Sequence, residues 1–198
     1  MQPETTTDTR HYPQFNVATA LTWLRIAAIP AVAVVFYWPG QWSKPLSCLV
    51  FTLAGLTDLL DGYLARRLGQ TSKFGAFLDP VADKLMVAVA LILLVQADPR
   101  IVIALVAAII IGREIAVSAL REWMAELGAR SRVAVSGIGK AKTTMQMIGL
   151  GAMLYTHDLY GVPVYDIGLA LLIVAAGITV WSMVGYIKAA WPGPAGES

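Results

Sequence analysis

The chain has 198 residues, of which 57% are hydrophobic and 14% are charged, and its formal net charge is +2 at pH 7. Ordinary soluble domains are less apolar and carry about 25% charged residues. The composition therefore indicates an integral membrane protein, and the small net charge gives no support for nucleic-acid binding. Cys48 is the only cysteine, so an intrachain disulfide is excluded.

Six stretches are apolar and long enough for transmembrane helices, each of which needs about 20 mostly apolar residues. They cover residues 17 to 38, 46 to 67, 79 to 97, 100 to 122, 141 to 157 and 163 to 187. The sequence thus predicts an all-α, polytopic membrane protein with six transmembrane helices in one domain, residues 16 to 190. Residues 1 to 15 lack the pattern of a cleaved signal and are expected to form a flexible or surface-lying arm. Residues 191 to 198 are expected to be a disordered tail.

Basic residues are concentrated on one side of this predicted topology. The only lysine or arginine residues in the connections after the first, third and fifth stretches are Lys44 and Arg100. The other connections and the two termini hold Arg10, Arg66, Arg67, Lys73, Arg130, Arg132, Lys140 and Lys188. Because cytoplasmic segments carry the excess of lysine and arginine, both termini are predicted to be cytoplasmic.

Four aspartates stand in the second and third stretches, where charge is unfavourable in lipid. Asp58 and Asp61 are three residues apart, and Asp79 and Asp83 are four apart, so each pair lies on one face of its helix. Four buried carboxylates require protons or cations, and a ligand set made only of oxygen favours a hard ion. The sequence therefore predicts a site for Mg²⁺ or Mn²⁺, and this ligand set is consistent with two ions.

Small residues accompany these aspartates. Gly62, Ala65 and Gly75 would let a ligand such as a planar base approach closely, although helix packing explains Ala65 equally well. Arg66 is placed to bind phosphate, with a solvated cytoplasmic cation as the alternative. The third helix is predicted to begin with Asp79 as its N-cap and Pro80 in its first turn.

The run Asp58-x2-Asp61-Gly62-x2-Ala65-Arg66-x8-Gly75-x3-Asp79-x3-Asp83 resembles the signature of the CDP-alcohol phosphotransferases, membrane enzymes of phospholipid synthesis. The resemblance implies two divalent metal ions, Mg²⁺ or Mn²⁺, bound by all four aspartates, and it makes Asp83 the general base. It also implies a homodimer. The CDP contacts that it implies come from Thr22, Asp61, Gly62, Ala65, Arg66, Ser72 and Gly75.

The downstream run "GREIAVSALREWMAELGARSRVAVSGIGKAKTTMQM" is similar to one bacterial branch of this family. That branch transfers the phosphatidyl group of CDP-diacylglycerol to glycerol 3-phosphate, which leads to phosphatidylglycerol and cardiolipin. The resemblance implies a multi-pass enzyme of the bacterial inner membrane with its active site facing the cytoplasm. A basic cluster in this region independently favours an anionic acceptor. The predicted ligands of the acceptor phosphate are Arg25, Arg113, Lys140 and Lys142.

Several alternatives stay open at this point. Arg113 forms either a phosphate contact or a structural salt bridge with Glu114 or Glu122. A sibling enzyme of the family would use inositol phosphate, serine or phosphatidylglycerol as its acceptor. A divalent-cation transporter would explain the aspartates but neither the small residues nor the basic cluster, and a structural scaffold explains least.

Overall fold

The computed structural model describes residues 17–68, 73–126 and 137–190. The predicted arm and tail lie outside these residues. The described chain is all-α, with short connections between its helices. The helices are α1 (Val17–Tyr37), α2 (Ser43–Leu68), α3 (Lys73–Ala97), α4 (Ile101–Glu126), α5 (Gly137–Tyr155) and α6 (Val164–Ala190).

The predicted apolar stretches agree with these helices to within four residues at every boundary except the start of α3. Within the described part of the chain, three stretches are long and apolar enough to cross a membrane: Ala20–Tyr37, Ile101–Glu126 and Val164–Met183. In α2, α3 and α5, charged residues toward one end dilute the apolar character. The membrane-protein class is therefore supported by three helices.

The prediction for the start of α3 was wrong. α3 begins at Lys73, and both Asp79 and Pro80 lie inside the helix, so Asp79 is not an N-cap. The predicted start was placed at Asp79, whereas α3 already includes the six residues before it, Lys-Phe-Gly-Ala-Phe-Leu. Pro80 has no N–H to donate to the carbonyl oxygen of Ala76, four residues earlier, so one helical hydrogen bond is missing beside Asp79.

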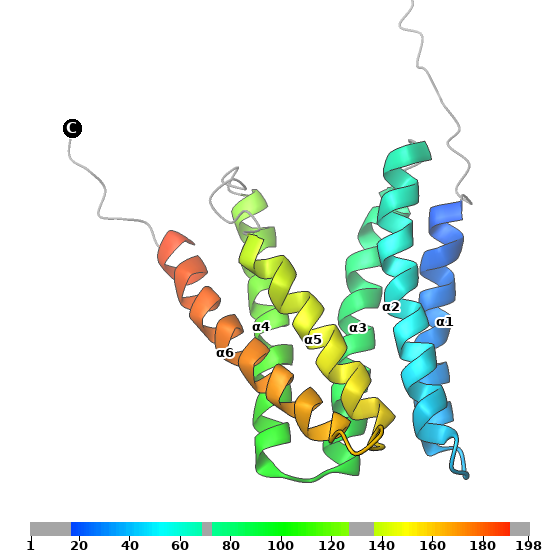
Figure 1. The fold of residues 1–198 in the computed structure, drawn as a ribbon. Helices are drawn as coiled ribbons and strands as arrows, with labels where there is room; N and C mark the ends of the chain where they lie inside the picture. The colour runs from blue at the N-terminus through cyan, green and yellow to red at the C-terminus, as the bar shows by residue number, and fades with distance from the viewer. Residues whose placement is uncertain (1–16, 69–72, 127–136, 191–198) are drawn as a thin grey trace, which may run out of the picture.

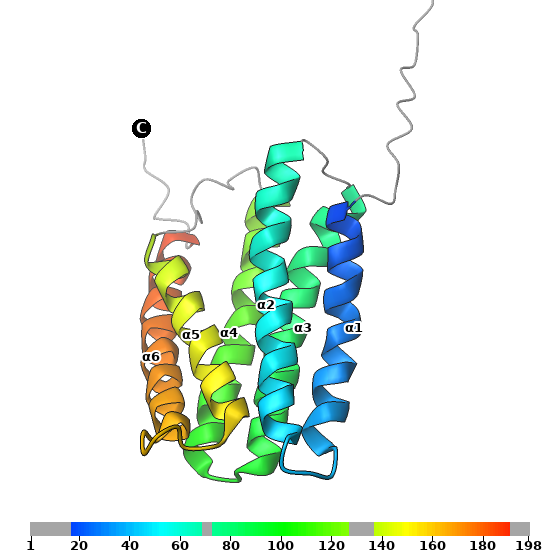
Figure 2. The ribbon, with the colours of Figure 1, turned by 45° about the vertical axis from the view of Figure 1, so that its right-hand side comes forward.

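The helices run alternately up and down and form one bundle (Figures 1 and 2). α3 packs against α1, α2, α4 and α5, and α5 also packs against α2 and α6. One end of the bundle, here called the loop end, carries the connections 38–42, 98–100 and 156–163. The opposite end, here called the charged end, holds the start of α3 and the end of α2. The charged stretches of the sequence are therefore brought together at one end.

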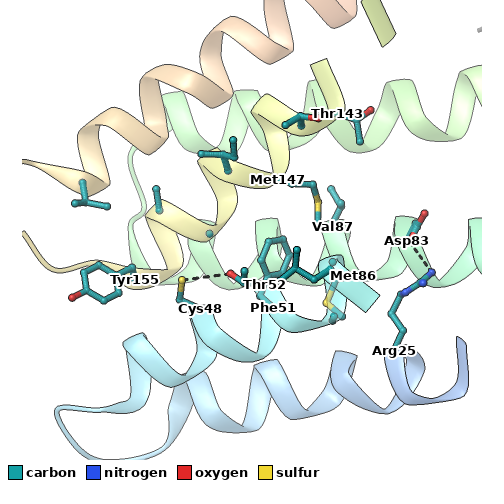
Figure 3. Close-up of a pocket in the computed structure, with 18 of the residues that line it drawn as sticks. Arg25, Cys48, Phe51, Thr52, Asp83, Met86, Val87, Thr143, Met147 and Tyr155 are labelled. Carbon is teal, nitrogen blue, oxygen red and sulfur yellow. Dashed lines mark hydrogen bonds and ion pairs between the residues drawn. The ribbon is translucent and has the colours of Figure 1, made fainter. Parts of the chain in front are cut away.

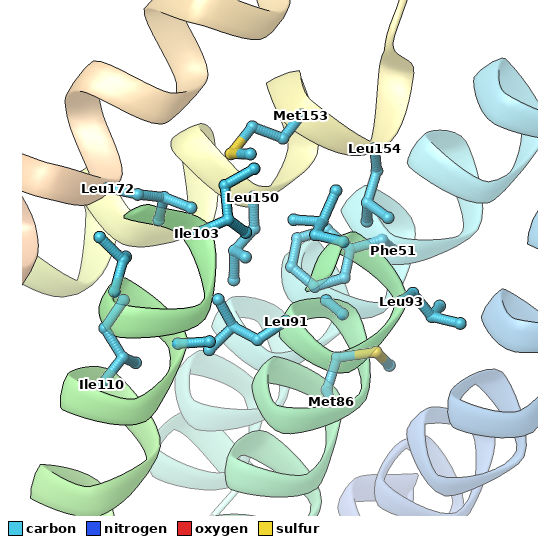
Figure 4. Packing of buried hydrophobic residues seen from close by; sticks show 14 of the residues in the cluster. Phe51, Met86, Leu91, Leu93, Ile103, Ile110, Leu150, Met153, Leu154 and Leu172 are labelled. Atoms are coloured by element: carbon cyan, nitrogen blue, oxygen red, sulfur yellow. The ribbon is translucent and has the colours of Figure 1, made fainter. Parts of the chain in front are cut away.

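Apolar side chains fill the space between the helices (Figure 4). This core is formed by Phe51, Met86, Leu91, Leu93, Ile103, Ile110, Leu150, Met153, Leu154 and Leu172. Large apolar side chains also cover the outside: Trp181 is 85% exposed and Ile101 is 77% exposed. An apolar outer surface of this kind marks contact with a membrane.

Two glycines bring α5 and α6 into close contact. A Cβ added at Gly168 would lie 2.8 Å from the carbonyl oxygen of Gly149, and one at Gly149 would lie 2.9 Å from that of Gly168. Such distances are too short for a side chain, so the backbones approach each other only because both residues are glycine.

We therefore expect Gly168→Ala to lower the free energy of unfolding by about 1–3 kcal/mol, as overpacking does. Gly177→Ala is the matched control on the same helix, because a Cβ there has nothing within 4 Å. The control should be neutral or stabilising by up to about 1 kcal/mol, since alanine is the better helix former. Thermal unfolding in detergent measures both variants, and an equal effect of the two would contradict the close contact.

A polar cluster joins the α3–α4 connection to the first turn of α6 at the loop end. Arg100 Nη2 lies 2.7 Å from Asp98 Oδ2, and the Tyr165 hydroxyl donates a hydrogen bond of 2.7 Å to the same oxygen. The hydrogen bonds from Arg100, reinforced by that from Tyr165, hold the pKa of Asp98 below its usual value. Asp98 is thus more acidic in the folded protein than in the unfolded chain.

A lowered pKa means that ionised Asp98 stabilises the folded state above its unfolded pKa of about 4, and that this stabilisation is lost as the pH falls through the folded pKa. We expect Asp98→Asn to lower the unfolding temperature near neutral pH, by a small amount because solvent screens the pair. The difference from the wild type should shrink in acid. Melting curves from pH 7 to pH 3 test this, and a constant difference would contradict it.

Candidate active site

Two carboxylates of α3 are held by polar residues of α1. Thr22 Oγ1 donates a hydrogen bond to Asp79 Oδ1, and Arg25 Nη1 donates one of 3.0 Å to Asp83 Oδ1. Thr22 and Arg25 are each 1% exposed, whereas the Asp83 side chain is 48% exposed. The spacings of three residues on α1 and four on α3 both correspond to about one helical turn. α1 therefore positions both carboxylates from one side while Asp83 stays accessible from the other.

The remaining predicted ligands of metal and CDP lie on α2 and around the start of α3. Asp58, Asp61, Gly62, Ala65 and Arg66 belong to the second half of α2, and Gly75 belongs to the first turn of α3. Their side chains lie outside the description, and Ser72 lies in the undescribed segment between the helices. Their contacts stay predictions.

The part of the chain that the structure describes contains no group of three or more His, Cys, Asp or Glu side chains able to hold a metal ion. This does not test the predicted set, because Asp58 and Asp61 are not among those side chains. α2 and α3 run in opposite directions, so the end of α2 and the start of α3 lie at the same end of the bundle (Figure 2). A set of oxygen ligands from these two helices fits a hard divalent cation.

A second charged cluster joins α4 to α5. Arg113 Nη1 lies 2.5 Å from Glu114 Oε1, and Lys142 Nζ lies 3.8 Å from the same oxygen. The side chains of Arg113 and Lys142 are only 10% and 4% exposed. The ion pair with Glu114, weighed as an alternative for Arg113, is therefore present. Two cations with little exposed surface therefore approach the same carboxylate oxygen.

The predicted ligands of the acceptor phosphate do not all fall in this cluster. Arg113 and Lys142 do, but Arg25 is paired with Asp83 on the other side of α3. The side chain of Lys140 lies outside the description. Arg25 is therefore placed to orient Asp83, a role that sequence reasoning did not give it.

Sequence reasoning also missed a link between the two charged clusters. Lys84, which follows Asp83 on α3, donates a hydrogen bond to Ser118 Oγ on α4. Ser118 lies one turn beyond Glu114 on the same helix. The position of Lys84 within an apolar stretch indicated that it needs a polar partner, but the sequence alone did not indicate that this partner is Ser118.

A cavity of about 760 Å³ begins at Arg25 and Asp83 and runs between α2, α3 and α5 toward Tyr155 at the loop end (Figure 3). Its walls are mainly apolar, with Phe51 and Met147 among them. The α5 wall is a stripe of residues at helical spacing, a signal that was visible in the sequence and was missed. The acidic site is thus continuous with an apolar space between α2, α3 and α5.

The helical bundle, the signature along α2 and α3 and the two carboxylates braced by α1 define the class of protein. Residues 15–181 match the family model of the CDP-alcohol phosphatidyltransferases. The chain belongs to this family.

Relatives from enteric bacteria are similar along nearly the whole chain. Proteins of Salmonella choleraesuis and Shigella flexneri serotype 5b are 51% identical to it over 177 residues, and one of Pectobacterium atrosepticum is 54% identical over the same length. Each alignment covers 89% of this chain and 96% of the relative. All three relatives are named CDP-diacylglycerol–glycerol-3-phosphate 3-phosphatidyltransferase.

Proposed function

We propose that this protein transfers the phosphatidyl group of CDP-diacylglycerol to glycerol 3-phosphate, with formation of phosphatidylglycerophosphate and release of CMP. The observation that carries the proposal is the identity of 51–54% to relatives named for this reaction, over 89% of the chain. The site adds support, because an acidic centre beside an apolar cavity suits a substrate that is part nucleotide and part lipid.

The proposed enzyme has six membrane spans in a bacterial inner membrane, with both termini and the charged end in the cytoplasm. The distribution of lysine and arginine along the chain supports this orientation. Glycerol 3-phosphate would then arrive from water, while CDP-diacylglycerol would arrive laterally from the bilayer. A homodimer is part of the same proposal and rests on membership of the family.

Two divalent ions, Mg²⁺ or Mn²⁺, would be held by Asp58, Asp61, Asp79 and Asp83. When bound, they would neutralise the pyrophosphate and stabilise the charge that develops as it is cleaved. Thr22 would fix the rotamer of Asp79 for this task. The predicted CDP contacts, Thr22 and Asp61 among them, would place the nucleotide against the end of α2.

In the proposed reaction, Asp83 accepts the proton of the primary hydroxyl of glycerol 3-phosphate. The hydroxyl oxygen attacks the phosphorus that carries diacylglycerol, the bond from this phosphorus to the bridging oxygen breaks, and CMP leaves with that oxygen. A carboxylate with an ordinary pKa near 4 is a weak base, so its position decides its efficiency. Arg25 supplies that position through the hydrogen bond from its Nη1 to Asp83 Oδ1.

The acceptor phosphate would bind at Arg113 and Lys142, with Lys140 nearby on α5. We expect Arg113→Ala to raise the KM for glycerol 3-phosphate about tenfold, because a charged hydrogen bond contributes about 1.5–3 kcal/mol. The KM for CDP-diacylglycerol should change much less. Arg100→Ala at the loop end is the matched control and should change neither constant. Equal increases of the KM for glycerol 3-phosphate and the KM for CDP-diacylglycerol in Arg113→Ala would show that the ion pair between Arg113 and Glu114 has only a structural role.

The proposed function is tested with purified protein, CDP-diacylglycerol, Mg²⁺ or Mn²⁺ and a panel of acceptors. Release of CMP with glycerol 3-phosphate, and not with inositol phosphate, serine or phosphatidylglycerol, is the expected result. Activity with one of the others instead would identify a sibling enzyme of the family. Uptake of divalent cations into proteoliposomes without CMP release would favour the transporter.

A further inference from the structure

Two neighbouring residues of α3 face two different parts of the site. Asp83 lines the cavity, whereas Lys84, the next residue, donates a hydrogen bond to Ser118 Oγ on α4. Successive residues are about 100° apart around a helix, so one piece of backbone can serve both directions. A shift of α3 relative to α4 would therefore move the proposed base.

A similar division of neighbouring residues occurs on α5. Lys142 belongs with Arg113 and Glu114 to the cluster between α4 and α5, here called the acceptor cluster. Thr143, the next residue, lines the cavity. Glu114 in turn lies one helical turn before Ser118 on α4. The acceptor cluster and the cavity are therefore neighbours, and the packing of α3, α4 and α5 sets the distance between them.

The hydrogen bond between Lys84 and Ser118 lies far from the connection that joins their helices. α3 ends at Ala97 and α4 begins at Ile101. Lys84 lies 13 residues before the end of α3, and Ser118 lies 17 residues after the start of α4, which is about 20 and 25 Å at 1.5 Å per residue. Two helices joined at one end can separate most at the other. The bond thus restrains α3 and α4 where their connection restrains them least.

The shape of the acceptor makes this distance important. In glycerol 3-phosphate, a chain of three carbon atoms separates the phosphate ester from the primary hydroxyl that reacts. A phosphate held by Arg113 and Lys142 therefore brings this hydroxyl to Asp83 only over a narrow range of distances between the helices. A misplacement of about 1 Å can lower the rate about 100-fold.

We infer that the hydrogen bond between Lys84 and Ser118 sets the distance from the acceptor cluster to Asp83, and that it thereby selects acceptors with three carbon atoms between hydroxyl and phosphate. The inference rests on the proposed function and adds two positioning residues to it. Lys84 acts by holding α3, and Ser118 acts by holding α4. Neither side chain is required to touch the substrate.

The first test compares glycerol 3-phosphate with 3,4-dihydroxybutyl phosphate of the same configuration, which has one more methylene group between the phosphate and the diol. Lys84→Met keeps an unbranched side chain but cannot donate the hydrogen bond, and Ser118→Ala removes the acceptor oxygen. In both variants, the ratio of kcat/KM for the three-carbon acceptor to that for the four-carbon acceptor should fall about tenfold, mainly through a lower kcat for glycerol 3-phosphate. Ser118→Thr keeps the hydroxyl and should keep the wild-type ratio.

Tyr37→Phe is the matched control for this comparison. It also removes a hydrogen bond between α3 and a neighbouring helix, from the Tyr37 hydroxyl to Gln96 Oε1 at the loop end, and it should keep the wild-type ratio. An unchanged ratio in folded Lys84→Met and Ser118→Ala proteins would overturn the inference. A raised KM for glycerol 3-phosphate in Lys84→Met, with Ser118→Ala like the wild type, would also overturn it, because Lys84 would then bind the acceptor itself. Absence of CMP release with glycerol 3-phosphate in the wild type would instead overturn the proposed function.

Thermal unfolding in detergent tests the hydrogen bond without the reaction. Lys84→Met and Ser118→Ala should each lower the unfolding temperature. The double variant should be about as stable as the less stable single variant, because either change already removes the bond. Additive losses in the double variant, or no loss in either single variant, would overturn the inference.

Discussion

Asp83→Asn is expected to lower the rate of CMP release by about 10²–10⁴-fold, which is the range that a positioned general base contributes. The amide cannot take the proton of the attacking hydroxyl. It does keep an oxygen where Asp83 Oδ1 accepts the hydrogen bond from Arg25, so the surroundings should stay in place. Because the Asp83 side chain is 48% exposed, the substitution should change the unfolding temperature little.

The measurement is single-turnover release of CMP with saturating glycerol 3-phosphate, together with binding of CDP-diacylglycerol in the presence of Mg²⁺ or Mn²⁺. Binding should partly survive in Asp83→Asn while turnover is lost. Asp98→Asn makes the same chemical change at the loop end, next to an arginine as well, and should turn over like the wild type. Near-normal turnover by Asp83→Asn would exclude the general-base role.

Substitution of Arg25 is expected to have the next largest effect, with kcat falling about 100-fold in Arg25→Ala and about tenfold in Arg25→Lys. Arg25 is 1% exposed and its Nη1 holds Asp83 at 3.0 Å. Lysine keeps the charge but loses the planar, rigid donor group that sets the direction of the bond. Asp83 remains half exposed in either variant, so its charge stays solvated and the fold should survive.

Separate measurement of kcat and KM decides what Arg25 does. If Arg25 orients Asp83, kcat falls and the KM for glycerol 3-phosphate changes little. If Arg25 binds the acceptor phosphate, as the sequence predicted, the KM for glycerol 3-phosphate rises most. Arg100→Ala, which removes a guanidinium paired with Asp98 at the loop end, is the control and should leave both constants unchanged.

The helices were predictable because each contains a long apolar stretch. The stretch from 17 to 38, for example, is visible from hydropathy alone, and the helix that the structure places there, α1, ends at Tyr37. The start of α3 was not predicted in this way, because the segment from Lys73 to Leu78 mixes a lysine, two small residues and three large apolar ones, and hydropathy does not distinguish a helix there from a connection. Membership of the family was predictable from the spacing of Asp58 to Asp83, which the family match confirms.

The partners of the site residues were less predictable than their identities. Spacing along one helix tells which residues share a face, but it carries no information on how two helices are rotated against each other. The bonds from Thr22 to Asp79, from Arg25 to Asp83 and from Lys84 to Ser118 all depend on that rotation. The cavity depends on it too, because only the packing of α2 against α5 places Gly151 opposite Thr52.

The bond between Arg25 and Asp83 also has a consequence for biogenesis. The two residues are 58 positions apart, and ribosomes add about 5–20 residues per second, so Arg25 is added to the chain roughly 3 to 12 s before its acidic partner. An arginine without a carboxylate partner costs up to about 3.5 kcal/mol at a bilayer centre. The arrival of α3 supplies the carboxylate, so the residue pair that orients the proposed base also draws the first and third helices together during synthesis.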